Sequence, residues 1–169
     1  MKNKKINSKF MVDHTQFMRA ALDEAEKARK LDEIPIGAVV TLNNEIIGRG
    51  CNSMIKNSDP TCHAEIMALR DAAHSLSNYR LPEVNLYVTL EPCIMCLGAI
   101  FHARVKQVYF GAYDAKFHSC DPSQQLVNNK TINHQTSFEG GILEEECSTL
   151  LKNYFKNKRG KKDPHNAGL

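Results

Sequence analysis

Long apolar runs are missing from this sequence. No stretch approaches the ~20 apolar residues that a membrane-spanning helix needs. The first residues are polar and lysine-rich and form no apolar leader, so we expect neither membrane insertion nor export. Internal repeats and low-complexity segments are absent too. With 169 residues, 42% of them hydrophobic, the chain is long enough to bury one core without disulfides.

A disulfide pattern is also missing. The sequence has six cysteines, and two of them form a C-x-x-C pair. Disulfides persist in oxidising compartments, so their expected absence predicts a cytoplasmic protein with reduced thiols. The four cysteines without an evident pairing pattern are Cys51, Cys62, Cys120 and Cys147.

Net charge is low, at only +3, but basic residues gather at both ends of the chain. We predict a disordered basic lead over residues 1–12, a single domain over 13–159 and a disordered tail over 160–169. The lysines of the lead are most simply explained by solvation. The C-terminal cluster continues a predicted helix and encloses Tyr154 and Phe155, which suits a phosphate backbone with unstacked bases nearby.

Two motifs carry the chemistry: H-A-E at residues 63–65 and, after 26 further residues, P-C-I-M-C at 92–96. Proline is favoured in the first turn of a helix, so the second motif predicts a helix start with Cys93 and Cys96 on one face. The helix dipole favours the thiolate form that binds metal. Together with His63, the two thiolates would hold a zinc ion and leave a fourth position for water, as in catalytic zinc sites.

Glu65 follows His63 by two residues, so we expect it to point away from the imidazole and not to be a ligand. Zinc lowers the pKa of bound water toward ~7, and a nearby carboxylate can take up that proton and return it to a leaving group. Glu65 is therefore the predicted catalytic proton shuttle. Chance explains many H-x-E motifs, and C-x-x-C alone also occurs in structural zinc knuckles and redox pairs. The two motifs together favour the catalytic site.

Hydrophobic patterning predicts alternating strands and helices. A strand, a helix and a strand follow one another between residues 84 and 110, which is typical of a βαβ unit with parallel strands. Ligands of such sheets bind at the carboxyl ends of the strands, where the second motif falls. We expect an α/β fold, a three-layer α/β/α sandwich with a mixed sheet of about five strands. The predicted helices cover 13–31, 63–74, 92–102 and 143–158, the predicted strands cover 38–42, 45–49, 84–90 and 105–110, and a polar loop covers 52–60.

The two motifs resemble the signature of the zinc-dependent nucleoside and nucleobase deaminase superfamily. Longer strings are similar to those of bacterial tRNA-specific adenosine deaminases, from about Phe17 to Lys116 and again from around Asn133 to Arg159. They are D-P-T-C-H-A-E-I-M-A-L-R over 59–70, N-Y-R-L over 78–81 and L-Y-V-T-L-E-P-C over 86–93.

This resemblance implies a cytidine-deaminase-like fold and hydrolytic deamination of adenosine to inosine at the wobble position, nucleotide 34, of an arginine tRNA anticodon. It also implies one zinc ion per subunit, no organic cofactor, a homodimer, and the tRNA anticodon stem-loop as partner. Two alternatives stay open. A deaminase of free guanine, cytosine or a nucleoside would not need the basic C-terminal helix, and a zinc-stabilised RNA-binding module would have no use for Glu65.

The substrate-binding residues are also implied by the resemblance. It places Asn52 against the target base and Asp59 at the pocket rim, whereas without it both read as loop residues that bond their own backbone. Residues 117–130 depart from the family's glycine-rich loop, and His118 and Cys120 stay unassigned. The other implied substrate contacts are Ile34, Asp114, Lys116, Lys158 and Arg159.

Overall fold

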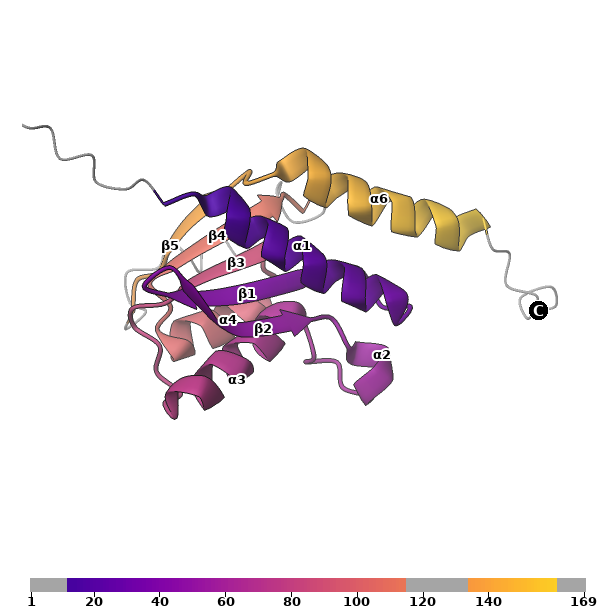
Figure 1. Cartoon of the computed structure of the whole chain (residues 1–169). Helices are drawn as coiled ribbons and strands as arrows, with labels where there is room; N and C mark the ends of the chain where they lie inside the picture. Colours follow the sequence, from indigo (N-terminus) through magenta and orange to yellow (C-terminus); the bar gives the residue numbers. More distant parts are fainter. Residues whose placement is uncertain (1–11, 115–133, 161–169) are drawn as a thin grey trace, which may run out of the picture.

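A mixed sheet of five strands forms the middle layer of the structure, a computed structural model that describes residues 12–114 and 134–160. The strand order is β2-β1-β3-β4-β5 (Figure 1). β1 pairs antiparallel with β2 and β3, whereas β3, β4 and β5 run parallel. The strands are β1 (Gly37–Leu42), β2 (Glu45–Cys51), β3 (Asn85–Leu90), β4 (Gln107–Ala112) and β5 (Ser137–Gly140).

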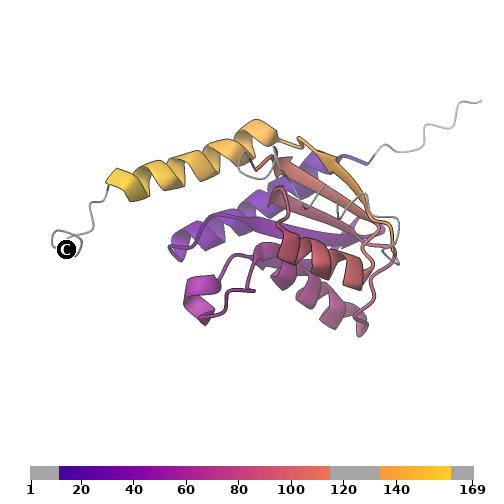
Figure 2. The same ribbon diagram turned by 180° about the vertical axis from the view of Figure 1, so that it is seen from behind.

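Helices cover both faces of this sheet (Figures 1 and 2). α1 (His14–Lys30) and α6 (Glu144–Gly160) lie on one face, and α3 (Ala64–Leu76) and α4 (Ile94–Ala103) lie on the other. The short helix α2 (Met54–Asn57) follows β2. The predicted three-layer α/β/α sandwich is therefore confirmed. No helix of the described residues is both long and apolar enough to cross a membrane.

Alternating side chains of the central strands build a core on each side of the sheet. Val40, Leu86 and Val108 belong to the cluster that includes residues of α3 and α4. Val39 and Tyr87 belong to the cluster under α1 and α6. Because both faces of β1 and β3 are buried, these strands are apolar along nearly their whole length, as expected for a covered sheet.

Glycines on β2 let α3 approach the sheet closely. A Cβ atom at Gly50 would lie 2.3 Å from the backbone nitrogen of Ala68, and one at Gly48 would lie 2.5 Å from the carbonyl oxygen of the same residue. Both distances are shorter than van der Waals contact allows, so only glycine fits there. The two glycines therefore determine how close α3, the helix that begins at the first motif, lies to the sheet.

The helix cap and the turn residues identified in the sequence take the predicted roles in the structure. Asp13 caps α1, its side chain accepting a hydrogen bond from the backbone nitrogen of Thr15. Asn43 and Asn44 take positive φ angles of 51° and 64° and join β1 to β2, which confirms the predicted hairpin.

Several predicted boundaries were wrong. The second zinc-motif helix starts at Ile94, not at Pro92, because Cys93 has extended backbone angles and is the N-cap. β4 lies two residues later than predicted. The predicted polar loop contains α2, and β5 was not predicted because only alternate residues of this short strand are even partly buried. Lys116, His118, Cys120, the 117–130 segment, most of the lead and most of the tail lie outside the described residues.

Candidate active site and metal centre

Two helix starts meet at the predicted metal site. His63 is the N-cap of α3 and Cys93 is the N-cap of α4, and both have extended backbone angles. Cys96 follows in the first turn of α4, which begins just beyond the carboxyl end of β3. This confirms the predicted place of the site in the sheet. The spacing of the second motif thus brings both sulfur atoms to one end of one helix.

The three side chains fit a zinc ion. His63 Nδ1 lies 3.7 Å from Cys93 Sγ and 3.6 Å from Cys96 Sγ, and all three atoms lie within 4.8 Å of one another. A tetrahedral zinc ion with bonds of ~2.3 Å to sulfur and ~2.0 Å to nitrogen separates such atoms by about 3.6 Å. His63 and Cys93 are only partly buried, whereas Cys96 is buried.

The pKa values of the two thiols, Cys93 and Cys96, are shifted in opposite directions. A hydrogen bond from Cys96, opposed by burial and helped by His63, lowers the pKa of Cys93 to about 4. The same hydrogen bond, together with burial and the charge of Glu65, raises the pKa of Cys96. Hydrogen bonding to Cys93 also raises the pKa of His63. The thiolate form is therefore favoured at Cys93, whereas Cys96 must lose its proton for both sulfur atoms to bind a metal.

Glu65 lies in the first turn of α3, directly beside this cluster. Its side chain is buried, and the burial raises its pKa to about 7, with the charge of Cys93 acting in the same direction and a hydrogen bond with Cys96 opposing it. A carboxyl group buried beside the candidate ligands is placed to exchange a proton with a water molecule bound there, as general acid–base catalysis requires. It is not part of the three-residue ligand group.

Asn52 is buried at the start of α3. Its side-chain oxygen accepts a hydrogen bond of 2.9 Å from the backbone nitrogen of Ala64, and so caps the helix, a bond that the side chain of His63 does not make. Its own backbone nitrogen donates to the carbonyl of Ile36 at 3.1 Å. The bond to Ala64 fixes the orientation of the amide group beside His63, a candidate metal ligand, and leaves Nδ2 as a donor.

Asp59 makes only local hydrogen bonds among the described residues. Its Oδ1 accepts from the backbone nitrogen and the hydroxyl of Thr61, at 2.8 and 2.7 Å, and its Oδ2 accepts from Cys62 Sγ at 3.2 Å. The hydrogen bonds from Thr61 lower the pKa of Asp59. This is the local loop bonding expected without the family resemblance, and it fixes the turn that leads to His63.

Two further predicted residues lie near the strand ends. Ile34 is partly buried in the turn between α1 and β1. Asp114 follows β4, and its backbone nitrogen donates to Glu91 Oε2 at 3.1 Å. Glu91 comes just two residues before Cys93, so this contact ties the segment after β4 to the metal site. Sequence reasoning gave Glu91 no role, although its place directly before the proline of the second motif was a signal.

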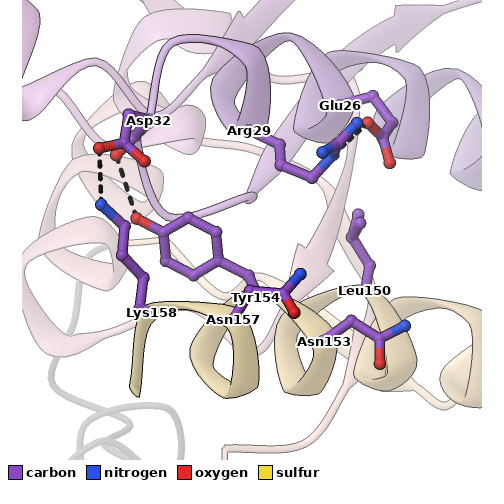
Figure 3. A pocket seen from close by; sticks show the side chains of 8 residues that line it. All are labelled: Glu26, Arg29, Asp32, Leu150, Asn153, Tyr154, Asn157 and Lys158. Atoms are coloured by element: carbon purple, nitrogen blue, oxygen red, sulfur yellow. Dashed lines mark hydrogen bonds and ion pairs between the residues drawn. The ribbon is translucent and has the colours of Figure 1, made fainter. Parts of the chain in front are cut away.

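Lys158 and Arg159 lie away from the metal ligands, at the end of α6 on the opposite face of the sheet. Lys158 Nζ is 2.6 Å from Asp32 Oδ2, and the hydroxyl of Tyr154 donates to the carbonyl oxygen of Asp32 at 3.0 Å. Figure 3 shows both bonds at one end of a cleft of about 430 Å³ between α1 and α6. Arg159 is exposed. The structure thus does not bring this basic pair to the metal site.

His63, Cys93 and Cys96 would hold the zinc ion, which when bound would supply an activated water as nucleophile. The chain adds a buried carboxyl group for proton transfer and an oriented amide for binding. This site, on a three-layer α/β/α sandwich, defines the class of the protein as a hydrolytic zinc deaminase.

Comparisons with known proteins agree with that class. Residues 11–112 match the family model of the cytidine and deoxycytidylate deaminase zinc-binding region. The chain is 45% identical to the tRNA-specific adenosine deaminase of Haemophilus influenzae, over 98% of this chain and 94% of that protein. It is 47% identical to the protein of the same name from Buchnera aphidicola, over 85% and 88% of the two chains. The chain therefore belongs to the cytidine and deoxycytidylate deaminase family, among the tRNA-specific adenosine deaminases.

A solved structure supports the same assignment. It comes from a study of A-to-I editing by tRNA deaminases at the wobble position of transfer RNA. It superposes with a TM-score of 0.76 at 41% sequence identity, and the match covers 81% of this chain and 99% of that one.

Proposed function

We propose that the protein converts adenosine to inosine at the wobble position of a tRNA anticodon, and that an arginine tRNA is its substrate. The observation that carries the chemistry is the three-ligand group of His63, Cys93 and Cys96 with Glu65 buried beside it. The choice of tRNA as substrate is supported by the names of relatives that match nearly the full chain. Because its proposed substrate, tRNA, is found in the cytoplasm, we propose that the protein is cytoplasmic.

Glu65 is the proposed proton carrier of the reaction. It takes a proton from the attacking water and passes one to ring nitrogen N1 as the oxygen attacks C6 of the adenine. It then takes the remaining proton from the hydroxyl group now bound to C6 and gives it to the departing amine, so that the C6–N bond breaks, ammonia leaves and inosine remains. The burial of its carboxyl group beside the three candidate ligands supports this role, because a proton carrier must lie next to the attacking water.

Binding of the base is proposed for the residues around the metal site. Asn52 offers its Nδ2 to the edge of the flipped-out adenine, while Ile34 forms an apolar part of the pocket wall. Asp59 sets the rim through its local hydrogen bonds. The proposed contacts with the anticodon loop and stem are Asp114, Lys116, Lys158 and Arg159.

We also propose that the protein is a homodimer with one zinc ion in each subunit. Ile55 on α2 and Ile94 on α4 are 71% and 53% exposed; Ile94 directly follows Cys93, and α2 lies in the segment that leads to His63. Large apolar side chains at such positions suit a two-fold interface that helps to close the pocket. Sedimentation equilibrium of the zinc-loaded protein tests this proposal, and a monomer at micromolar concentration would contradict it.

Glu65→Gln is the direct test of the proposed reaction. Removal of the proton carrier should lower kcat for inosine formation in an arginine tRNA at least about 100-fold, because general acid–base catalysis contributes that much or more. Zinc content should stay at one ion per chain. The control is Glu83→Gln, which removes an exposed carboxylate paired only with Lys106 among the described residues and should leave kcat unchanged. A Glu65→Gln variant with wild-type kcat would contradict the mechanism.

A further inference from the structure

Glu33 is a fully buried acid that the reaction does not use. It lies in the turn between α1 and β1, and its side chain is 0% exposed. Oε1 accepts a hydrogen bond of 2.8 Å from the backbone nitrogen of Lys56. Oε2 is buried and has no hydrogen-bond partner within the described part of the chain. A buried carboxylate with one unsatisfied oxygen costs folding free energy, so its presence calls for a compensating role.

The hydrogen bond from Lys56 identifies that role. Lys56 is the third residue of α2, and the first backbone N–H groups of a helix have no partner within the helix. Ser53, the N-cap of α2, makes no side-chain capping bond. Glu33 therefore supplies the missing cap from 23 residues away. A helix of only four residues is not stable alone, so its position depends on such outside contacts.

The position of α2 in turn governs the metal-site loop. α2 lies within the segment that joins Asn52 to His63. The loop folds back on it through two backbone hydrogen bonds, from Ser53 to the carbonyl of Cys62 at 3.0 Å and from Asp59 to the carbonyl of Met54 at 3.1 Å. A shift of α2 would therefore move the segments that carry the oriented amide and the zinc-binding imidazole.

A second contact links the same turn to the pocket. The carbonyl oxygen of Ile36, three residues after Glu33, accepts the hydrogen bond from the backbone nitrogen of Asn52. The turn thus holds the loop at its start, through Asn52, and at α2, through Lys56.

We propose that Glu33 is a positioning residue for the deaminase pocket, which caps α2 and keeps the loop from Asn52 to His63 in its binding-competent conformation. The proposal rests on the function proposed above, since it concerns the pocket for the target base. The protein gives up some stability for this contact, because a buried apolar side chain of the same size would not leave an oxygen unsatisfied.

Glu33→Met tests the proposal, because methionine fills a similar volume without an acceptor. We expect an unchanged or higher Tm and one zinc ion per chain. KM for the tRNA stem-loop should rise about tenfold while kcat changes less than twofold, because only a fraction of the molecules would then be competent to bind. The amide of Lys56 should exchange with solvent markedly faster, as measured by NMR. Glu33→Gln keeps an acceptor oxygen and should restore KM to within about threefold of the wild type.

Glu24→Met is the matched control. Glu24 is a buried acid on α1, 4% exposed, but it binds the side chains of Lys27 and Arg49 at 2.7 and 3.4 Å and makes no hydrogen bond or ion pair with α2 within the described part of the chain. This variant should leave KM and the exchange rate at Lys56 unchanged.

Three results would overturn the proposal. A Glu33→Met variant with wild-type KM and wild-type exchange at Lys56 would remove the positioning role. A Glu33→Gln variant as impaired as Glu33→Met would show that the charge, not the acceptor, matters. A fall in Tm with unchanged KM would indicate a purely structural role. If the wild-type protein fails to deaminate the stem-loop, the proposed function fails, whereas exchange at Lys56 still decides the role of Glu33.

Discussion

Ionised Glu65 lowers the free energy of unfolding of the protein when no metal is bound. It is 4% exposed and lies beside the thiolate of Cys93, and the resulting pKa of about 7 is well above its ordinary value of 4.5. The folded, metal-free protein therefore holds a proton on Glu65 that the unfolded chain has already lost between these two pH values. Its stability falls as the pH rises from about 4.5 to 7, and the full penalty remains above pH 7.

Glu65→Gln should remove that penalty. In metal-free protein with EDTA and a reductant, we expect the variant to be more stable than the wild type by roughly 3 kcal/mol at pH 8, since each pKa unit corresponds to about 1.4 kcal/mol. The two proteins should converge in stability near pH 4.5. Urea unfolding at both pH values measures the difference. Equal stabilities at pH 8 would mean that Glu65 has an ordinary pKa in the metal-free fold.

Individual residues differed in how far the sequence revealed them. His63, Cys93 and Cys96 could be named because a metal ligand set needs particular residue types at particular spacings. Glu33 could not, because its cap on α2 joins residues that are 23 positions apart, and an acid in a turn gives no signal of burial. The local bonding of Asp59 is typical of its residue type in loops, and its role at the pocket rim stays a prediction.

The packing of α3 on β2 offers a test of how the fold holds the metal site. Gly50→Ala would place a Cβ atom 2.3 Å from the backbone nitrogen of Ala68, so α3 must move away from the sheet. We expect a loss of about 3 kcal/mol in the free energy of unfolding, as for severe overpacking. Zinc affinity should also fall, because α3 begins at a metal ligand. Urea unfolding and competition with a chelating dye measure the two effects.

Gly98→Ala is the control for that variant. Gly98 lies within α4, and an added Cβ there has no atom within 4 Å among the described residues. The change should stabilise the fold by about 0.5–1 kcal/mol, since glycine weakens a helix interior relative to alanine. A Gly50→Ala variant as stable as Gly98→Ala would show that α3 does not depend on this close approach.

The attachment of α6 to α1 makes a prediction about RNA binding. Lys158 is paired with Asp32 at the end of α6, and this pair is largely exposed, so it contributes little to stability. Asp32→Asn would free the Lys158 ammonium group to contact a phosphate of the RNA. This one additional charged contact should tighten binding of the stem-loop about two- to fivefold. Lys158→Gln should weaken binding of the stem-loop. It should also reduce by about one the magnitude of the slope of log affinity against log salt concentration. Fluorescence anisotropy at several salt concentrations measures both.

Glu146→Gln is the matched control for α6. It breaks the ion pair with Arg19, 2.8 Å long, at the opposite end of the same helix. We expect stem-loop affinity within twofold of the wild type. If Asp32→Asn and Glu146→Gln change affinity equally, the effect is one of net charge, and the proposed contact of Lys158 with RNA is contradicted.

Elements with strong local signals were the ones that the sequence predicted. α1 has an acidic cap and an apolar stripe, and the β1–β2 hairpin has an Asn-Asn turn. α2 and β5 have four residues each, and each is held mainly by contacts with distant segments, such as Glu33 for α2 and β4 for β5. Four residues make barely one turn of a helix or two repeats of a strand, which is too little for periodicity to reveal elements that depend on tertiary contacts.

The assembled molecule places its two predicted functional regions on different faces. The metal site lies at the starts of α3 and α4, whereas the basic end of α6 lies on the opposite face of the sheet. A small free base would need only the first region. A folded RNA is large enough to contact both, directly or through the partner subunit of the proposed dimer. The single domain predicted over residues 13–159 stays a prediction.

Substrate selection by the zinc-loaded protein tests this account most directly. An arginine tRNA anticodon stem-loop with adenine at the wobble position is incubated with the protein, in parallel with free adenosine, cytidine and guanine, and the products are identified by mass spectrometry. We predict inosine at the wobble position and no conversion of the three small molecules. Conversion of a free base or nucleoside, with the stem-loop unchanged, would contradict the central claim while leaving the zinc chemistry in place.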